Sequence, residues 1–510
     1  MMFVGIHFGI VMKKLINLNQ MSNATDILGH PRGLFVCFAT EMWERFSYYG
    51  MRALLIFYLT KHWEFSDATS YIIYAAYTSL VYIMPVFGGL LADRILGSRK
   101  AVTYGAILLV LGHLGMTIET NVQIFYLSLA LIISGVGFLK PNISTMVGAL
   151  YEKDDPRRDA GFTIFYMGIN IGAFTASLLC GYLGETYGWS YGFGAAGIGM
   201  LLGLIIFLWG QEYLDGNAEP PSDLHLQKYL NITYETWAYI SGIFMVLSSW
   251  ILIQNQEVVG NLLGGLGVIC IGFWLFYALV KLDPIERDRL LTVGFLILFS
   301  LLFWALFEQA GSSLNVLTDR GVDRNLFGWN VPASMFQSLN AMFIFILAPF
   351  FSMLWISLAK RGLEPAGPIK FGIALLFVGF GFLVLVFGMS ISPNLTPVAW
   401  IILIYLLHTI GELCISPIGL SLVTKLSPQK IVGIMMGIWF FASAAGNFVA
   451  GLIARATSAD GINVANDTFS IDQKAAFMDV YYNVGIFAVI IGVFVLLISP
   501  LMIKRMHGIK

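Results

Sequence analysis

The sequence has little charge. Only 12% of its 510 residues are Asp, Glu, Lys or Arg, about half of the roughly 25% typical of soluble domains. Hydrophobic residues make up 58%, and the mean hydropathy is +0.78. The formal net charge of −1 leaves no excess of cations to bind nucleic-acid phosphates. These values exclude a soluble enzyme, argue against a nucleic-acid partner, and predict a protein embedded in the lipid bilayer.

Cysteine is also scarce. The four cysteines, Cys37, Cys180, Cys270 and Cys414, lie far apart and inside apolar runs, which does not fit a metal site or a disulfide framework. A membrane-embedded enzyme would need a nucleophile–base pair or a cluster of metal ligands within a span, and neither pattern is present. We therefore expect no metal, no cofactor and no enzymatic activity.

Long hydrophobic runs are abundant. A membrane-spanning helix needs about 20 mostly apolar residues, whereas β-barrel strands would give alternating segments of about ten residues, which we do not find. Fourteen helical runs lie at about 34–60, 69–92, 100–118, 122–150, 160–184, 190–209, 236–254, 259–280, 290–314, 331–359, 368–388, 397–424, 431–454 and 475–503. The sequence therefore predicts an all-α, polytopic membrane protein with 14 transmembrane helices.

The distribution of Lys and Arg predicts that both termini are cytoplasmic. With the N-terminus in the cytoplasm, 21 of the 29 Lys and Arg residues fall on the cytoplasmic side, five on the opposite side and three inside spans, which is the bias typical of membrane proteins. An apolar stretch precedes Lys13 and Lys14, whereas a signal peptide places its positive charge first. We therefore expect Met21 as the natural start, with residues 1–20 as upstream sequence or a disordered tail.

A long polar connection separates six spans from eight. Many twelve-helix transporters consist of two six-helix halves joined by a cytoplasmic linker, and the first two of the eight later spans contain no ionisable residue. The predicted domains are a cytoplasmic tail at 1–32, an N-terminal six-helix bundle at 33–210, a cytoplasmic linker at 211–235, two additional helices at 236–283, a C-terminal six-helix bundle at 284–503 and a cytoplasmic tail at 504–510.

Seven charged residues lie well inside the predicted spans, away from their ends. A charge at the bilayer centre costs about 3 kcal/mol on insertion scales, so such residues usually face a cavity or a partner. The seven are Glu41, Glu44, Arg45 and Arg52 in the first span, Lys140 in the fourth, Glu308 in the ninth and Glu412 in the twelfth. At about 100° per residue, those of the first span share one helical face with Tyr48 and Tyr49, which should line water or substrate rather than lipid. An alternative remains that some of these charges pair only to hold helices together.

The two halves differ in the sign of these charges. The first half contributes three cations and two carboxylates, whereas the second contributes only Glu308 and Glu412. A gap between the halves would then be positive on one wall and negative on the other. Such a gap suits a zwitterion, and amino acids or short peptides are the obvious candidates. Pro141 follows Lys140 directly and Pro417 lies five residues after Glu412, which predicts helices that are broken or kinked at these charges.

Several segments resemble one transporter family. Residues 41–50 (EMWERFSYYG) resemble the ExxERFxYYG signature of the proton-dependent oligopeptide transporters, a branch of the major facilitator superfamily. Further segments that resemble the family or the superfamily lie at 88–100, 138–142, 162–172, 336–340 and 411–417. The resemblance implies a major facilitator fold with two additional helices and proton-coupled import of di- and tripeptides across a bacterial inner membrane.

The resemblance also implies roles for individual residues. The peptide carboxylate would meet Arg45, Arg52, Lys140, Tyr49 and Tyr82, with Tyr74 and Tyr77 as alternatives to Tyr82; the peptide ammonium would meet Glu412, Asn170 and Asn340; and Trp304, Glu308, Trp439 and Ser443 would form the side-chain pocket. For the two tryptophans, simple packing or an interfacial position is an equal alternative.

Proton coupling and gating are assigned to charged residues. We expect Glu44, with Glu41, to carry the transported proton, because a peptide carboxylate that engages Arg45 would release these carboxylates for protonation. His113 and His408 are expected to be hydrogen-bonded packing residues. Lys140 and Glu412 would pair when the protein closes toward the cytoplasm, and Asp93 would act in a conformational lock. The alternatives are a drug or sugar transporter of the same superfamily and a relative that carries nitrate or another anion.

Overall fold

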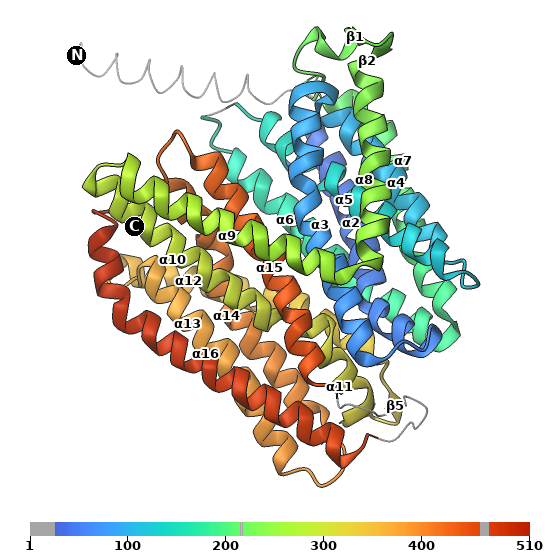
Figure 1. The fold of residues 1–510 in the computed structure, drawn as a ribbon, viewed down its shortest axis with the longest axis vertical. Helices are drawn as coiled ribbons and strands as arrows, with labels where there is room; N and C mark the ends of the chain where they lie inside the picture. Colours follow the sequence, from blue (N-terminus) through green and yellow to red (C-terminus); the bar gives the residue numbers. More distant parts are fainter. Residues whose placement is uncertain (1–25, 153, 215, 217, 459–468, 510) are drawn as a thin grey trace, which may run out of the picture.

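The structure is a computed structural model, and it describes residues 26–152, 154–214, 216, 218–458 and 469–509 (Figure 1). The predicted start at Met21 and most of the predicted tail 1–32 lie outside these residues. The long α-helices are α2 (Arg32–Phe57), α3 (Asp67–Leu91), α4 (Gly97–Gly115), α5 (Val122–Ala149), α6 (Arg158–Tyr187), α7 (Trp189–Gly210), α8 (Tyr234–Gln254), α9 (Gln256–Lys281), α10 (Pro284–Phe307), α12 (Ser338–Lys360), α13 (Gly367–Ser390), α14 (Val398–Leu426), α15 (Val432–Ala456) and α16 (Ile471–Arg505).

The remaining elements are short. The nine-residue helix α11 covers Ser313–Gly321; the π-helical segments are η1 (Tyr58–His62) and η2 (Ala92–Leu96); and the 3-10 helices are η3 (Gln211–Leu214), η4 (Asp223–Leu226), η5 (Glu308–Gly311) and η6 (Ala333–Gln337). Two-residue strands pair as β1 (Lys228–Tyr229) with β2 (Ile232–Thr233) and β4 (Asn325–Leu326) with β5 (Trp329–Asn330), both antiparallel, and as β3 (Val322–Asp323) with β6 (Thr396–Pro397), parallel.

The helices confirm an all-α, polytopic membrane protein. Among the described residues, twelve helical stretches are long and apolar enough to cross a membrane. One of them, Asp67–Gly115, joins α3 and α4, and α2 is not among them because four ionisable side chains lie on its inner turns. The count of 14 crossings and the cytoplasmic position of the termini therefore stay predictions.

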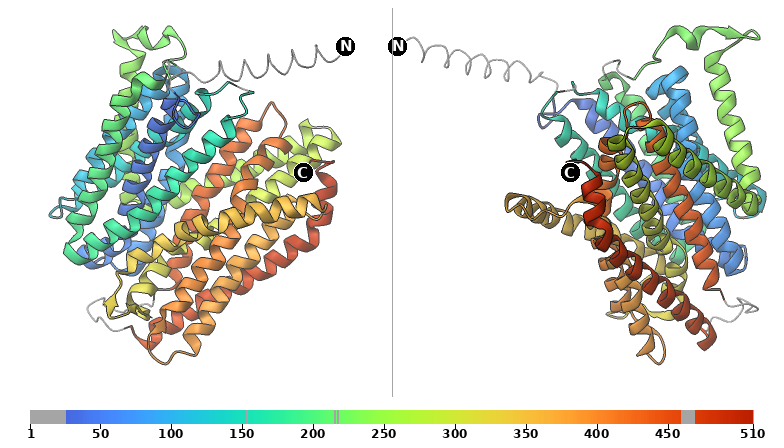
Figure 2. Two further views of the ribbon diagram at one scale, coloured as in Figure 1. Left: turned by 180° about the vertical axis from the view of Figure 1, so that it is seen from behind. Right: turned by 60° about the vertical axis from the view of Figure 1, so that its left-hand side comes forward.

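The long helices form two groups (Figures 1 and 2). In the first, α2 packs against α6 and α7, α4 against α5 and α7, and α3 against α5; in the second, α13 packs against α14 and α16, and α10 against α14 and α15. The groups meet where α3 packs against α15 and α6 against α12. Helix α8 packs against α5 and α3, whereas α9 contacts α10, α15 and α3. The two additional helices thus lie on different groups.

The ninth predicted span is not one continuous helix. The sequence predicts a single span at 290–314, but α10 ends at Phe307 and the chain continues as η5 and α11. Ser312 has φ −123° and ψ −102°, which no helix adopts. The side-chain amide of Gln309 donates to the carbonyls of Ala305 (3.1 Å) and Ala450 (2.9 Å), which ties this break to α15.

The predicted breaks at proline do not occur. Pro141 lies inside α5 and Pro417 inside α14, and both helices continue past the proline. The amide of Asn142 donates to the carbonyl of Phe138 at 2.6 Å, one way in which a polar side chain satisfies the backbone of a helix interrupted by proline.

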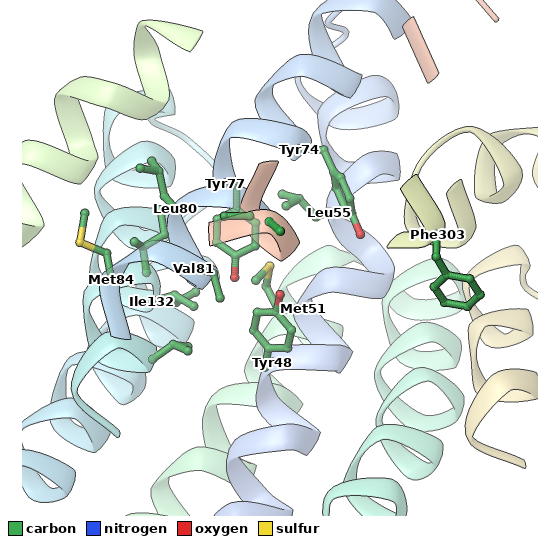
Figure 3. Packing of buried hydrophobic residues seen from close by; sticks show 14 of the residues in the cluster. Tyr48, Met51, Leu55, Tyr74, Tyr77, Leu80, Val81, Met84, Ile132 and Phe303 are labelled. Atoms are coloured by element: carbon green, nitrogen blue, oxygen red, sulfur yellow. The ribbon is translucent and has the colours of Figure 1, made fainter. Parts of the chain in front are cut away.

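Aromatic side chains fill the contact between α2 and α3. Tyr48 and Tyr77 stack with their ring centres 6.5 Å apart, and Met51 is fully buried beside them. Figure 3 shows these side chains together, with Leu80 and Val81 on the same side of α3. This packing holds α2, the helix with most of the buried charged residues, in place against α3.

One close helix contact predicts a selective loss of stability. A Cβ added at Gly88 in α3 would lie 2.2 Å from the backbone oxygen of Gly137 in α5, whereas one added at Gly89 would meet Pro141 only at 3.6 Å. Overpacking of this kind costs about 1–3 kcal/mol. Gly88→Ala is expected to lower the thermal unfolding temperature of the purified protein clearly, and Gly89→Ala to leave it unchanged or raise it slightly. Equal unfolding temperatures for the two variants would contradict the packing described here.

Candidate functional site

Two carboxylates share one guanidinium on α2. The Nε atom of Arg45 lies 3.1 Å from Oε1 of Glu41 and forms a closer ion pair with Oε2 of Glu44. All three side chains are buried, and both carboxylate oxygens of Glu44 and Nη2 of Arg45 have no well-aligned hydrogen bond. With both acids ionised the cluster would keep a net charge of −1 in a buried place, which is costly. Two buried carboxylates thus share one guanidinium.

Arg52 joins the two groups of helices. Its Nη2 atom forms an ion pair with Oε2 of Glu308 in η5, and its Nε donates to the hydroxyl of Tyr74 in α3 at 2.6 Å. The guanidinium also lies 5.8 Å from the centre of the Tyr49 ring, within range of a cation–π contact. Arg52 is therefore the centre of a polar contact between α2, α3 and the end of α10.

Lys140 and Glu412 stand on opposite groups without an ion-pair partner among the described residues. The ammonium of Lys140 lies 4.6 Å from the centre of the Tyr82 ring. Glu412 accepts a hydrogen bond from the amide of Asn340 at 2.8 Å, and the same amide reaches Thr409 at 3.1 Å. Within the described residues, Lys140 of the N-terminal group and Glu412 of the C-terminal group thus each lie in the site without a direct ion pair.

The charges of the two groups act on one another. Lys140 lies within electrostatic range of Arg45, Glu44 and Glu41 on its own side and of Glu308 on the other. Glu412 is in range of Glu308, and the hydroxyl of Tyr49 is in range of charges from both groups. The residues that the sequence placed on two walls therefore belong to one electrostatic site.

The two groups are firmly joined at one end of this site. We call this end, where α2 ends and α3 begins, the far end. There Arg320 donates two hydrogen bonds to Asp67 (2.6 and 2.9 Å), and Lys61 forms an ion pair with Asp319 at 2.7 Å. Further links run from Ser334 to Glu185 and from Asn315 to the carbonyl of Ala53. The structure therefore represents a state in which the far end is closed.

Comparison with known proteins agrees with this geometry. A model of the POT family matches residues 99–469. The chain is 38% identical over 489 residues to the uncharacterized transporter YclF of Bacillus subtilis, covering 94% of this chain and 96% of that one. It is 37% identical over 471 residues to the peptide transporter YePEPT of Yersinia enterocolitica, covering 87% and 91%. The chain belongs to the POT family.

A solved structure of the same family has the same fold. A mutant of peptide transporter POT in complex with alafosfalin superposes with a TM-score of 0.82 at 35% identity, and the match covers 95% of this chain and 97% of that one. The POT family consists of transporters, so this protein is a multi-pass membrane transporter and not an enzyme. The predicted family is confirmed.

The predicted carboxylate-binding residues of this POT protein lie close together. Arg45, Arg52 and Tyr49 are on α2, and the choice between three tyrosines of α3 has a structural answer. The ring of Tyr82 lies beside Lys140, whereas Tyr74 binds Arg52. Tyr74 is therefore a polar partner within the site that the sequence offered only as an alternative to Tyr82.

Three residues are predicted to bind the peptide ammonium, and two of them are hydrogen-bonded to each other in the structure. Asn340 is hydrogen-bonded to Glu412, whereas the amide of Asn170 donates to the carbonyl of Tyr166 in its own helix, α6. Among the described residues, Asn170 makes no hydrogen bond to Glu412. Spacing could not reveal this, because Asn170 and Glu412 come from different groups whose relative position depends on the tertiary structure.

The predicted pocket residues lie on α10 and α15. Trp304 packs edge-on against Phe303 and Phe307. The ring of Trp439 fills the space beside Gly419, where an added Cβ would lie 2.2 Å from it, and the hydroxyl of Ser443 donates to the carbonyl of Trp439 at 3.4 Å. Their packing is clear, and their role as a side-chain pocket stays a prediction.

The two intramembrane histidines behave differently. Nε2 of His408 lies 3.2 Å from the carbonyl of Val378, as expected of a hydrogen-bonded packing residue. His113 is fully buried, but neither of its ring nitrogens has a hydrogen-bond partner among the described residues. The expected hydrogen bond of His113 is therefore wrong; a Cβ added at Gly197 of α7 would lie only 3.4 Å from the Cβ of His113, so a glycine faces the histidine there.

The ion pairs of the far end were not found from the sequence. Asp67, Asp319 and Arg320 lie at the ends of predicted spans or in loops, where charge is common and carries no signal by itself. Asp93, predicted as part of a lock, lies exposed in η2 at the opposite end of α3 from Asp67. The structure thus adds an ion-pair contact between the groups that local spacing does not encode.

Exchanging the charges of one far-end pair is expected to restore what single changes remove. Because the Asp67–Arg320 hydrogen bonds cross between the groups, Asp67→Arg alone and Arg320→Asp alone should each lower the uptake rate about tenfold, the effect of about 1.4 kcal/mol. The double variant Asp67→Arg/Arg320→Asp should recover most of the uptake in proteoliposomes. A double variant that is as slow as the product of the two single losses would show that the pair is not coupled.

Proposed function

We propose that this protein imports di- and tripeptides together with protons, by alternating access, across the bacterial inner membrane. The observation that carries the proposal is that two groups of opposite charge lie on opposite walls without a direct ion pair within the described residues: the ammonium of Lys140 on one wall and the carboxylate of Glu412 on the other. A peptide zwitterion offers the two complementary charges at its ends. Peptide-transporter relatives and POT structures support peptide transport as the activity.

The proposed binding mode places each peptide terminus on one wall. Lys140, Arg45, Arg52, Tyr49 and Tyr82 bind the carboxylate of the peptide. Glu412 binds the ammonium, and Asn340 holds the carboxylate of Glu412 in place; Asn170 would contribute only after a change of side-chain conformation. Trp304, Trp439, Ser443 and Glu308 surround the peptide side chains. An anionic substrate would leave Glu412 without a partner, and this disfavours nitrate or another anion.

The proposed proton carrier is the cluster of Glu44, Glu41 and Arg45. A peptide carboxylate that binds Arg45 weakens the attraction of Arg45 for the two acids, so one of them takes up a proton. Peptide binding and protonation are then thermodynamically linked, which coupled transport requires. One charge that crosses 100 mV is worth about 2.3 kcal/mol, enough for roughly 50-fold accumulation of a neutral zwitterion.

The proposed cycle alternates between closure at the two ends. In the state described here the far end is held by ion pairs such as Asp67–Arg320. When the opposite end closes, Lys140 and Glu412 pair with each other and Asp93 contributes to a lock, until a peptide competes with that pair. With cytoplasmic termini, as the sequence predicts, the closed far end would lie on the outer side of the membrane. The two bundles at 33–210 and 284–503 would rock against each other.

A competition experiment tests the substrate class. In cells that express the protein, uptake of a labelled dipeptide is expected to fall to background in the presence of excess dialanine or trialanine. Free alanine carries both charges but holds them too close together to reach the two walls, and N-acetylated, amidated dialanine carries neither charge. Both should compete weakly. Failure of both unmodified peptides to compete would contradict the proposed substrate.

A further inference from the structure

A cavity unrelated to the peptide site lies on the outer side of the N-terminal group. It is an open cavity of about 400 Å³ between the start of α4, the end of α7 and the start of α8. These helix ends lie near the top of Figure 1. Its walls include Arg99 and Lys100 at one end and Ile107 and Leu208 at the other. The cavity therefore has a charged mouth and an apolar continuation.

The charged mouth contains both signs. Arg99 donates two hydrogen bonds to Glu219 of the linker (2.5 and 2.8 Å), and Lys100 forms an ion pair with Glu235 at 2.8 Å. These hydrogen bonds from Arg99 hold the pKa of Glu219 below its usual value, so this acid stays ionised. Partly exposed ion pairs of this kind contribute little net stability, and a ligand that replaces both partners in each pair can displace them.

The apolar continuation leads along the surface of α4. Ile107, Leu111 and Leu114 are all exposed, and spacings of four and three residues place them on one face of the helix. Exposed Leu208 and Trp209 of α7 lie at the same end as the cavity. In a membrane-spanning helix such a face contacts acyl chains, whereas Lys, Arg and Tyr gather at the level of the lipid head groups.

We propose that this cavity binds one phospholipid whose head group carries a primary ammonium, as in phosphatidylethanolamine. The phosphate pairs with Arg99 and Lys100, and the ammonium donates to Glu219 and Glu235. An acyl chain follows Ile107 and Leu111 along α4. The phosphate accepts charge-assisted hydrogen bonds from Arg and Lys as a carboxylate does, and the ammonium supplies new partners for the two acids that it displaces. The presence of two acids disfavours a purely anionic lipid, and a choline head group has no N–H to donate.

Because Arg99 also ties the linker to α4, the bound lipid would contact the linker. The backbone N–H of Arg99 donates to the carbonyl of Ala218 at 3.0 Å. Gly97 has φ +71°, and a Cβ there would lie 2.5 Å from the backbone of Glu219. The linker therefore forms one side of the charged mouth, and its acid is held within reach of a head group.

Native mass spectrometry of the detergent-purified protein tests this proposal. Phosphatidylethanolamine, phosphatidylcholine and phosphatidylglycerol with identical acyl chains are titrated separately. We expect one phosphatidylethanolamine to bind at least about tenfold more tightly than either other lipid, the effect of one charge-assisted hydrogen bond or more. Glycerophosphoethanolamine, the head group without chains, should not bind at the same concentrations. Equal affinity for the three lipids, or equal binding of the free head group, would overturn the proposal.

Three variants separate the charges of the site. Arg99→Gln/Lys100→Gln should weaken binding of phosphatidylethanolamine about tenfold or more, whereas Arg94→Gln, on the same loop but outside the cavity, should not. Glu235→Gln should remove the preference over phosphatidylcholine without loss of phosphatidylcholine binding. Unfolding temperatures measured without lipid show whether each variant is folded. If the double variant Arg99→Gln/Lys100→Gln does not fold, Glu235→Gln alone tests the proposal. An unchanged lipid preference in Glu235→Gln contradicts the assignment of the ammonium.

Discussion

Proton-driven accumulation of peptide is expected to disappear in Glu44→Gln, while exchange of peptide between the two sides continues. Glutamine has nearly the shape of glutamate but cannot take up and release a proton near neutral pH. Glu44 is fully buried and shares Arg45 with Glu41, so no water can replace the lost function easily. In proteoliposomes at 100 mV, the accumulation ratio should fall from roughly 50 to about 1.

Counterflow supplies the necessary comparison. Vesicles loaded with unlabelled dipeptide should still take up labelled dipeptide through Glu44→Gln, because exchange needs binding and rocking but no net proton movement. Glu257→Gln, at an exposed position at the start of α9, is the matched control and should accumulate peptide normally. Uphill uptake that survives in Glu44→Gln would show that the proton travels elsewhere, and loss of counterflow as well would indicate a role in binding or folding.

Removing the charge of Glu412, the proposed partner of the peptide ammonium, should strongly lower the affinity for dipeptides. In Glu412→Gln the peptide ammonium loses its ionised partner, and the expected drop in dipeptide affinity is about 10- to 100-fold, as for a hydrogen bond to a charged group. N-acetylated dipeptides, which carry no ammonium, should bind the wild type and the variant about equally. Competition against a labelled dipeptide measures both affinities. A variant that discriminates between the two ligands as strongly as the wild type would show that Glu412 does not bind the ammonium.

Lys140 provides the complementary measurement. Lys140→Gln should weaken the binding of dipeptides with a free carboxylate, and the binding of C-terminally amidated dipeptides should not change. If Lys140 and Glu412 also pair when the protein closes, the transport losses of Lys140→Ala and Glu412→Ala should be less than additive in the double variant. Additive losses would confine each residue to its own peptide terminus and remove the proposed gate.

In this state Lys140 and Glu412 form no ion pair within the described residues. Arg52 pairs with Glu308 across the groups, and Asp67 pairs with Arg320 at the far end. Under the proposed function, Lys140 and Glu412 therefore bind the two ends of a substrate or, in the opposite closed state, each other. Ion pairs that exist in only one state are the differential contacts that a two-state transporter requires.

Much of this protein could be predicted from the sequence alone. The shortage of charge and the long apolar runs determine a helical membrane protein, because each span must be apolar along its own length. The polar face of α2 also follows from local spacing, since Glu41, Arg45 and Arg52 recur at helical intervals. The family could also be predicted from the sequence, because its motifs are short, continuous segments that follow one another along the chain.

Only the tertiary structure decided which charges meet. The pairing of Arg52 with Glu308, the contact of Tyr74 rather than Tyr82 with Arg52, and the closed far end all depend on how two groups of helices cross, which no single segment encodes. At the end of α10, Gln309 donates to the carbonyl of Ala450 in the neighbouring helix α15. At Pro141, by contrast, the hydrogen bond from Asn142 to Phe138 lies within α5 itself. Local periodicity determines which side of a helix is polar, and packing determines what that side touches.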